Sequence, residues 1–465
     1  MPHDITIANE HSKRVAEFVC ELKFQDIPNE VLQRAKMLIL DSFGCGIFGA
    51  NLQWVNIIYE TLKDIDTDQS HGIWGSDRKL SALNAALLNG TQVQGFELDD
   101  IHRRGVLHVG AVTLPPVIAV ANMATNFTGK DFITSAIAGY EVGPRVGICM
   151  RPDHIGQGWH SGATVGTFSA AAGAARALGL DKEKTIHALG IAGTQAAGLM
   201  AAQYGAMVKR MHAGKSAQSG LLAALLAQRG FTGILDVFEA PYGGFCTTFS
   251  RSKDRFDLEE LSRGLGESFE LMNIALKFYS CVASNHTTLD AIKDIQQRRP
   301  FSYNEVSEIK IWGSQVTVDH VGWPYTPQGL TSAQLNLPFC VATLLLEGDV
   351  SPKQFDESCV TDEKRIALSQ KVHCIHDPEI TSKGSHFRHM VHVEVIFNDG
   401  KTERQTREFQ RGSEHDFADD QTIIKKFMTL TSERISTNQQ NEIIDKIMNI
   451  EALPDIKKLT NLLVL

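Results

Sequence analysis

The sequence lacks a basic excess and a long apolar run, and each absence removes a class of partner. Lysine and arginine number 45 against 54 acidic residues, and the formal net charge is −9. A nucleic-acid-binding face needs a stripe of Lys and Arg to neutralise phosphates, and the basic residues here are scattered. Gly, Gln, Lys or Glu interrupts every apolar stretch before it reaches the length of a spanning helix. We therefore expect neither nucleic acid nor a membrane as partner.

The sequence also lacks paired cysteines and a targeting segment. Its eight cysteines are widely spread, with no C-x-x-C spacing. Residues 1–10 contain no apolar signal core and no Arg-rich presequence. Cysteines used in this way are typical of a reducing compartment, where most are small buried apolar groups. We expect a cytoplasmic protein.

Common nucleophile and nucleotide motifs are missing too. There is no G-x-S-x-G and no P-loop. Gly156 and Gly158 form a G-x-G, but no strand precedes it and no acidic residue follows at the ribose distance. A glycine loop that offers backbone N–H groups of the next helix to a small anion, with His160 at its mouth, fits better. We expect no cofactor.

Histidines recur at metal-like spacing in two places. His386, His389 and His392 form H-x-x-H-x-x-H, but the segment runs into an expected strand, where a spacing of three alternates faces. His373 and His376 flank a cysteine in what reads as a loop. Structural or solvent-facing roles are favoured over zinc for all of these, and we expect no metal site.

The length and the patterning predict a mostly α protein of two domains. At 465 residues the chain exceeds what one core usually supports. Apolar and small residues at helical spacing fill its first half, including a helix expected to end near Gly143 and Pro144. Strand-like alternation appears from Glu305, and Asn398-Asp399-Gly400 predicts a hairpin turn. We predict a large helical domain from residues 1–270 and 412–465, with a smaller α+β domain, residues 271–411, inserted between them.

Two polar islands interrupt the apolar pattern. Residues 94–116 hold three carboxylates, two imidazoles and two guanidiniums within a dozen positions. This density indicates either an active-site wall or a capped helix end with solvated arginines, and both interpretations stay open. Residues 203–215 bring Lys209, Arg210, His212 and Lys215 close together. A solvated basic face and an anion site both fit, although the small residues and methionines on either side favour an interior position.

Several stretches together resemble the MmgE/PrpD family. The resemblance covers nearly the whole chain and is carried by ELDD (97–100), LHVGAVTLPPVIA (107–119), GWHSGATVGT (158–167), ALGIAGTQAAGLM (188–200) and MVKRMHAGKSAQSG (207–220). The family includes 2-methylcitrate dehydratases, cis-aconitate decarboxylases and iminodisuccinate epimerases. The fungal type of cis-aconitate decarboxylase is the branch most resembled, through IPNEVLQRAKMLILD (27–41), AQYGAMVKR (202–210), YGGF (242–245) and HVGW (320–323).

The resemblance implies a fold and a set of site residues. It implies that the inserted α+β domain is a lid, that the protein is a homodimer, and that the site lies at the domain junction. The implied catalytic residues are His108, His160, Lys209 and Lys277, and the acidic cluster is Glu97, Asp99 and Asp100. The sequence departs from the animal enzymes at the lid histidine, because Val282 stands there and His286 follows a few residues later.

These residue types suit a small polycarboxylate substrate. Lys209 and Lys277, with Arg103 or His212, can hold carboxylates through charge-assisted bonds. Loss of carbon dioxide from cis-aconitate leaves charge on an allylic carboxylate, and a histidine, His108 or His160, can then protonate carbon while Asp99 and Asp100 orient imidazole. We expect cis-aconitate decarboxylation to itaconate. A dehydratase, an epimerase or a non-catalytic polyanion-binding protein would use the same residues, and the sequence does not separate these readings.

Overall fold

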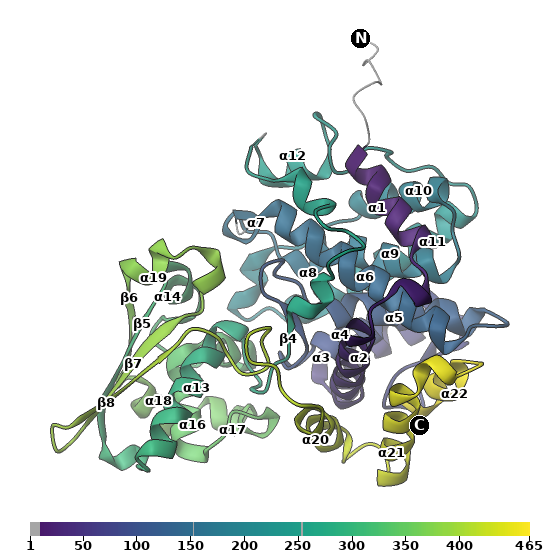
Figure 1. Cartoon of the computed structure of the whole chain (residues 1–465). Coiled ribbons are helices and arrows are strands. Elements are labelled where there is room, and N and C mark those ends of the chain that lie inside the picture. Colours follow the sequence, from purple (N-terminus) through teal and green to yellow (C-terminus); the bar gives the residue numbers. More distant parts are fainter. Residues whose placement is uncertain (1–9, 152, 253) are drawn as a thin grey trace.

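The computed structural model describes residues 10–151, 153–252 and 254–465, and it is mostly α-helical, as predicted (Figure 1). The large helical part is formed first by α1 (Glu10–Glu21), α2 (Asn29–Gly49), α3 (Gln53–Lys63), α4 (Ala82–Gln94), α5 (Val109–Met123), α6 (Gly129–Met150), α7 (Asp153–Gly156), α8 (Ser161–Thr164), α9 (Gly166–Ala177), α10 (Lys182–Gly193), α11 (Val208–Gln228) and α12 (Phe245–Ser250). Within the described ranges, no helix is both long enough and apolar enough to cross a membrane.

The smaller part contains a sheet and seven helices among its described residues. The sheet runs in the order β6-β5-β7-β8, with β5 (Val306–Gly313) parallel to β6 (Val372–His376) and antiparallel to β7 (Val391–Phe397), which pairs with β8 (Thr402–Arg407). The helices are α13 (Ala283–Arg298), α14 (Gln315–Val321), α15 (Leu330–Leu335), α16 (Leu337–Glu347), α17 (Glu357–Val360), α18 (Glu363–Ser369) and α19 (Pro378–Ser382). The turn between β7 and β8 is the predicted Asn398-Asp399-Gly400, where Gly400 has a φ of 80°.

The chain then returns to the large part. Helices α20 (Asp420–Thr431), α21 (Thr437–Met448) and α22 (Lys457–Thr460) lie beside α2 and α5, in yellow in Figure 1. One hydrophobic core joins buried side chains of residues 15–276 with those of residues 423–463. A second core joins residues 279–397 with side chains of residues 54–96. The two cores fit a two-domain architecture built from both chain ends, while the exact limits at 270 and 411 stay a prediction.

Helices in the large part approach closely where glycines face each other. A Cβ built on Gly214 of α11 would lie 2.0 Å from the backbone oxygen of Leu87 and 2.3 Å from Oγ1 of Thr91, both on α4. A Cβ on Gly90 of α4 would lie 2.8 Å from Cα of Gly214. Only glycine allows this contact, which fixes α11 and its polar residues against α4.

Two short strands bring distant segments of the chain side by side. β3 (Ile101–His102) pairs with β4 (Ile274–Ala275), with Ile101 opposite Ala275 and His102 opposite Ile274. This pairing brings the loop that leads to His108 next to the segment that leads to Lys277, although more than 160 positions separate them in the chain.

Candidate functional site

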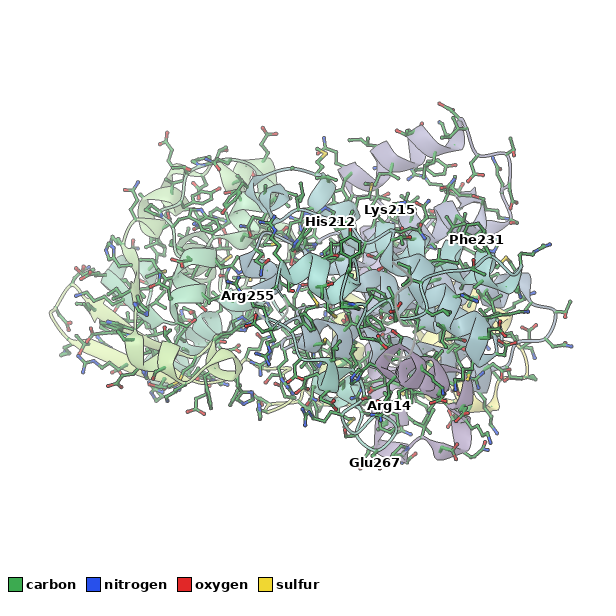
Figure 2. The ribbon with its side chains drawn as sticks, turned by 90° about the horizontal axis from the view of Figure 1, so that it is seen from above. Arg14, His212, Lys215, Phe231, Arg255 and Glu267 are labelled. Atoms are coloured by element: carbon green, nitrogen blue, oxygen red, sulfur yellow. The ribbon has the colours of Figure 1, made fainter. Side chains whose placement is uncertain are left out.

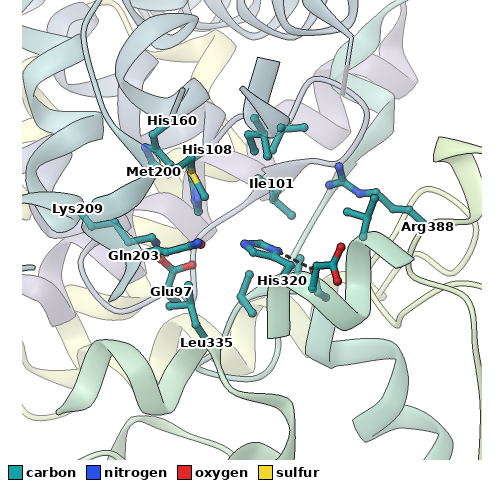
Figure 3. Close-up of a pocket in the computed structure, with 18 of the residues that line it drawn as sticks. Glu97, Ile101, His108, His160, Met200, Gln203, Lys209, His320, Leu335 and Arg388 are labelled. Carbon is teal, nitrogen blue, oxygen red and sulfur yellow. Dashed lines mark hydrogen bonds and ion pairs between the residues drawn. The ribbon is translucent and has the colours of Figure 1, made fainter. Parts of the chain in front are cut away.

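A cavity of about 580 Å³ lies at the junction of the two parts (Figure 3). The large part contributes the loop before α5, the α7–α8 loop, the 3-10 helix Met200–Tyr204 and the start of α11. The smaller part contributes the start of α13, α14, the end of α15 and the segment before β7. Five of the ten predicted site residues line it: Glu97, His108, His160, Lys209 and Lys277.

His108 precedes the first turn of α5 and is held by a carboxylate. Its Nδ1 lies 2.8 Å from Oδ2 of Asp99, which is fully buried. Burial alone would raise the pKa of Asp99, but the charges of His108 and Lys277 hold that pKa below its ordinary value. An ionised Asp99 fixes the proton of His108 on Nδ1 and leaves Nε2 as the free ring nitrogen.

Glu97 is the centre of a buried ion network. Lys209 donates to its Oε1, Lys277 lies 3.2 Å from its Oε2, and Arg210 lies 3.3 Å from Oε1. Burial would raise the pKa of Glu97, but Lys209 and Lys277 hold it well below its ordinary value. Burial lowers the pKa of Lys209, whereas Glu97 and Asp99 overcome burial and raise the pKa of Lys277. Glu97 also adopts a φ of 56°, in the left-handed region that costs energy for a residue with a Cβ and is often found at functional sites.

His160 and His212 form an imidazole pair. Their Nδ1 atoms are 3.0 Å apart, and the ring centroids of His108 and His160 are 6.5 Å apart. Burial, Lys209 and His212 hold the pKa of His160 well below its ordinary value, and burial with Lys209 lowers that of His212 to about 4. Both rings are therefore neutral at pH 7, with one donating to the other. His212 lies behind His160 and does not line the cavity.

The second polar island divides between the interior and the surface. Lys209, Arg210 and His212 are buried, whereas Lys215 is exposed and donates to Gln218 at 2.9 Å. Figure 2 labels His212 and Lys215. The sequence left open whether this segment is interior or forms a solvated basic face. Lys209, Arg210 and His212 are interior, whereas Lys215 faces solvent.

Of the five predicted site residues that do not line the cavity, Asp100, Arg103 and His286 are held by other parts of the protein. Asp100 accepts from the backbone N–H of Gly110, and burial with the charge of Asp99 raises its pKa to about 8. Arg103 donates to Glu414, with Nε at 3.2 Å, and lies over the ring of Phe409. Nε2 of His286 lies 3.2 Å from the backbone oxygen of Cys281, while Val282 lines the cavity. Asp100, Arg103 and His286 therefore do not line the cavity, and the roles predicted for them in the site stay predictions.

The glycine loop uses its own backbone donors within the protein, whereas the predicted anion contact with N–H groups of the following helix α8 stays a prediction. The backbone N–H groups of Gly158, Trp159 and His160 donate to the carbonyls of Ile155, His154 and Gly198, at 2.8, 3.2 and 3.1 Å. These three donors are used within the protein, so they are not free to bind an anion.

The smaller part contributes five polar residues that were not among the predicted site residues: Ser284, Asp319, His320, Arg388 and His389. Burial and the charge of Arg388 lower the pKa of His320 to about 4, and burial lowers that of Arg388 to about 10. His320 lies in the HVGW stretch, which was used only to support the resemblance to the family. His389 lies in the H-x-x-H-x-x-H pattern, which was considered only as a possible metal site.

The histidines of that motif do not converge. His386 packs against His415 and Phe409, His389 lines the cavity, and Nδ1 of His392 lies 2.7 Å from Oγ1 of Thr406. In the described part of the chain, the one group suited to a metal is His386, Glu414 and His415, whose ligand atoms lie within 4.8 Å of one another. It lies outside the cavity lining, and Arg103 already occupies the carboxylate of Glu414.

Comparisons with known proteins agree with the resemblance. Family models match at residues 13–257, for the MmgE/PrpD N-terminal domain, and at residues 279–451, for the MmgE/PrpD C-terminal domain. The chain is 33% identical to the cis-aconitate decarboxylase-like protein oryM of Aspergillus oryzae, over 99% of this chain and 98% of that protein. It is 32% identical to a cis-aconitate decarboxylase of Aspergillus terreus, over 97% and 95% of the two chains, and 26% identical to the human cis-aconitate decarboxylase, over 95% and 92%.

Proposed function

Because this chain belongs to the MmgE/PrpD family, we propose that it is a cofactor-independent carboxy-lyase that converts cis-aconitate to itaconate. One observation carries the proposal: His108, His160, Lys209 and Lys277 come from four distant stretches of the chain and line one cavity. Relatives named cis-aconitate decarboxylase, matched over nearly their full length, support the choice of substrate.

Lys209 and Lys277 anchor substrate carboxylates in this proposal. Both ammonium groups pair with Glu97, and Nζ of Lys277 also lies 3.4 Å from Oδ1 of Asp99. A substrate carboxylate competes for these donors, and the buried setting makes each charge-assisted bond stronger than in water. Binding accelerates the reaction only where the cations face the carboxylate on which charge develops.

The chemical step needs a proton and no external oxidant. The bond between carbon and one carboxylate breaks, carbon dioxide leaves, and the electron pair delocalises over the allylic system into a remaining carboxylate. A proton then adds to carbon to give itaconate. We assign the donor to His108, because the Asp99 carboxylate pairs with its ring at 2.8 Å, whereas burial and nearby cations keep His160 neutral.

The smaller part acts as a lid in this proposal. It supplies His320, Arg388 and His389 to the cavity wall, so its movement would open the site to substrate and its closure would exclude water.

We further propose a homodimer, as the family resemblance implies. Exposed apolar side chains near the cavity, Leu199, Tyr204, Met207 and Val208, are 62%, 65%, 44% and 46% exposed, and a second copy would cover them. Sedimentation equilibrium is expected to give twice the chain mass of 51.2 kDa, and the mass of one chain at micromolar concentration would contradict the dimer.

A proton NMR assay with the purified protein tests the proposed reaction. Incubation with cis-aconitate, 2-methylcitrate and iminodisuccinate in separate samples is expected to give itaconate from the first alone. Loss of water from 2-methylcitrate would instead indicate a dehydratase, and deuterium exchange into iminodisuccinate without net product would indicate an epimerase. Tight binding without any spectral change would indicate a non-catalytic polyanion-binding protein.

A further inference from the structure

Arg388 is the cation of the cavity wall that lacks a carboxylate partner in the described chain. Lys209 and Lys277 both pair with Glu97, but no acidic group of the described residues lies within 4.0 Å of Arg388. Asp319 also lines the cavity, and its Oδ1 accepts from Nε2 of Gln315 at 2.7 Å. Arg388 is half-buried and lines the cavity without a counter-charge from the described residues, which leaves its guanidinium available to an anion that is not part of the chain.

The position of Arg388 is fixed from two sides. Its Nε donates to Nε2 of His389 at 3.1 Å. Its backbone oxygen accepts from Oγ of Ser314 and from Oγ1 of Thr317, both at 2.6 Å. These bonds use Nε and the backbone but leave the two terminal nitrogens, which are the pair that binds a carboxylate in bidentate geometry. Figure 3 shows the guanidinium reaching from the smaller part toward Ile101 in the cavity.

His389 has the chemistry of a positioning residue. Because its Nε2 accepts from Arg388, the ring must be neutral, with its proton on Nδ1. Burial and the charge of Arg388 hold the pKa of His389 well below its ordinary value, which keeps this acceptor available. The lysine and arginine side chains of the cavity lining are Lys209, Lys277 and Arg388, and apolar residues that include Ile101, Val106, Val316 and Leu335 also line it.

We propose that Arg388, oriented by His389, binds a second carboxylate of the substrate, separate from the one held by Lys209 and Lys277. The cavity then selects ligands with at least two anionic groups, one that reaches the lysines and one that reaches Arg388. This inference rests on the proposed function and adds to it a selection for polycarboxylates over monocarboxylates. It also places a specificity group on the smaller part, so substrate binding itself draws that part onto the site.

Arg388→Gln tests the proposal, with Lys383→Gln as a matched control. Lys383 lies in the same segment, packs on Phe387 and does not line the cavity. For Arg388→Gln we expect KM for cis-aconitate to rise about ten- to hundredfold and kcat to change less, the effect of losing one charge-assisted carboxylate bond. Calorimetric affinity for tricarballylate, a saturated tricarboxylate, is expected to fall by a similar factor, and Lys383→Gln is expected to behave as wild type.

The two readouts separate this inference from the proposed reaction. If wild-type protein makes no itaconate, the proposed reaction fails, yet weaker tricarballylate binding by Arg388→Gln would still support the carboxylate site. Unchanged KM and unchanged tricarballylate affinity in Arg388→Gln would overturn the inference even if itaconate is made.

A pair of substitutions at His389 tests its positioning role. His389→Gln keeps an oxygen that can accept from Nε of Arg388, whereas His389→Leu removes the acceptor. We expect His389→Leu to weaken tricarballylate binding about tenfold and His389→Gln to recover most of that loss. Equal affinities in the two variants, with matching thermal unfolding curves, would contradict the role assigned to His389.

Discussion

Asp100 and Asp99 are adjacent, yet their surroundings give their carboxyl groups opposite properties. Asp99 faces His108 and Lys277 and is held ionised. Asp100 faces the backbone N–H of Gly110, and burial together with Asp99 raises its pKa to about 8. The sequence E-L-D-D indicated a polar island but could not assign these states, because they depend on Gly110 and on Lys277, 177 positions further along the chain from Asp100. Asp99 is therefore an ionised carboxylate that positions His108, whereas Asp100 is a mostly protonated, buried acid at pH 7.

Asp100→Asn should change how stability depends on pH. The folded-state pKa of Asp100 lies above the ordinary value of about 3.9. The contribution of its protonated carboxyl group to the stability of the folded protein is therefore fully present below about pH 4 and is lost as pH rises through about 8. Asparagine keeps a carbonyl acceptor for Gly110 and cannot ionise. We expect the variant to gain stability over wild type at pH 8.5, with a difference that shrinks toward pH 5 at up to about 1.4 kcal/mol per pH unit. Thermal unfolding at both pH values checks this, and a difference that does not vary with pH would contradict it.

Among the secondary-structure elements, patterning predicted the kinds of element better than their ends. The alternation before Asn398 and its turn residues predicted the β7–β8 hairpin, because strand register and turn type are local properties. The end predicted near Pro144 was wrong, since α6 continues to Met150. Proline removes one hydrogen bond, but α6 is buried along nearly its whole length, and its packing outweighs that local cost.

Helices α11 and α4 lie close together at Gly214, which leaves no room for a side chain at that position. Gly214→Ala would place a Cβ against backbone of α4 and displace α11, which carries Lys209. We expect a loss of about 1–3 kcal/mol of stability, with lower activity as Lys209 moves. Gly313→Ala is the matched control, because its Cβ would meet Thr317 at 3.6 Å, an ordinary contact distance. Chemical denaturation of both variants compares them, and equal stabilities would contradict the packing argument.

On the scale of the whole molecule, the order of helical, mixed and helical segments predicted the arrangement of the two parts but not the complete site. The resemblance identified Glu97, His108, His160, Lys209 and Lys277, which line the cavity. It did not identify Arg388 or His320, because their approach depends on how the loops of the smaller part meet the larger one. For Arg103 the sequence predicted a contact with substrate. In the folded chain its guanidinium donates to the carboxylate of Glu414 instead.

The C-terminal helices also support the site from a distance. Nζ of Lys426 on α20 lies 2.6 Å from Oδ1 of Asp41 and donates to the backbone oxygen of Leu98 at 2.7 Å, within the loop that carries Glu97 and Asp99. Lys426→Ala leaves Asp41 buried without its partner, and we expect a loss of about 3–5 kcal/mol of stability. Lys425→Ala, at the exposed neighbouring position, is expected to unfold as wild type. Thermal unfolding compares the two, and similar midpoints would show that the C-terminal part does not hold this loop.

We propose that His108 and Lys209 act on one polycarboxylate in a shared cavity, and kcat/KM for cis-aconitate tests this most directly. Wild type is to be compared with His108→Gln, Lys209→Met and the control His376→Gln, whose ring lies outside the cavity lining, beside Thr381. We predict a fall of at least about a hundredfold for each of the first two variants and wild-type behaviour for the control. A fall of less than about tenfold in both, roughly 1.4 kcal/mol of barrier, would contradict the account.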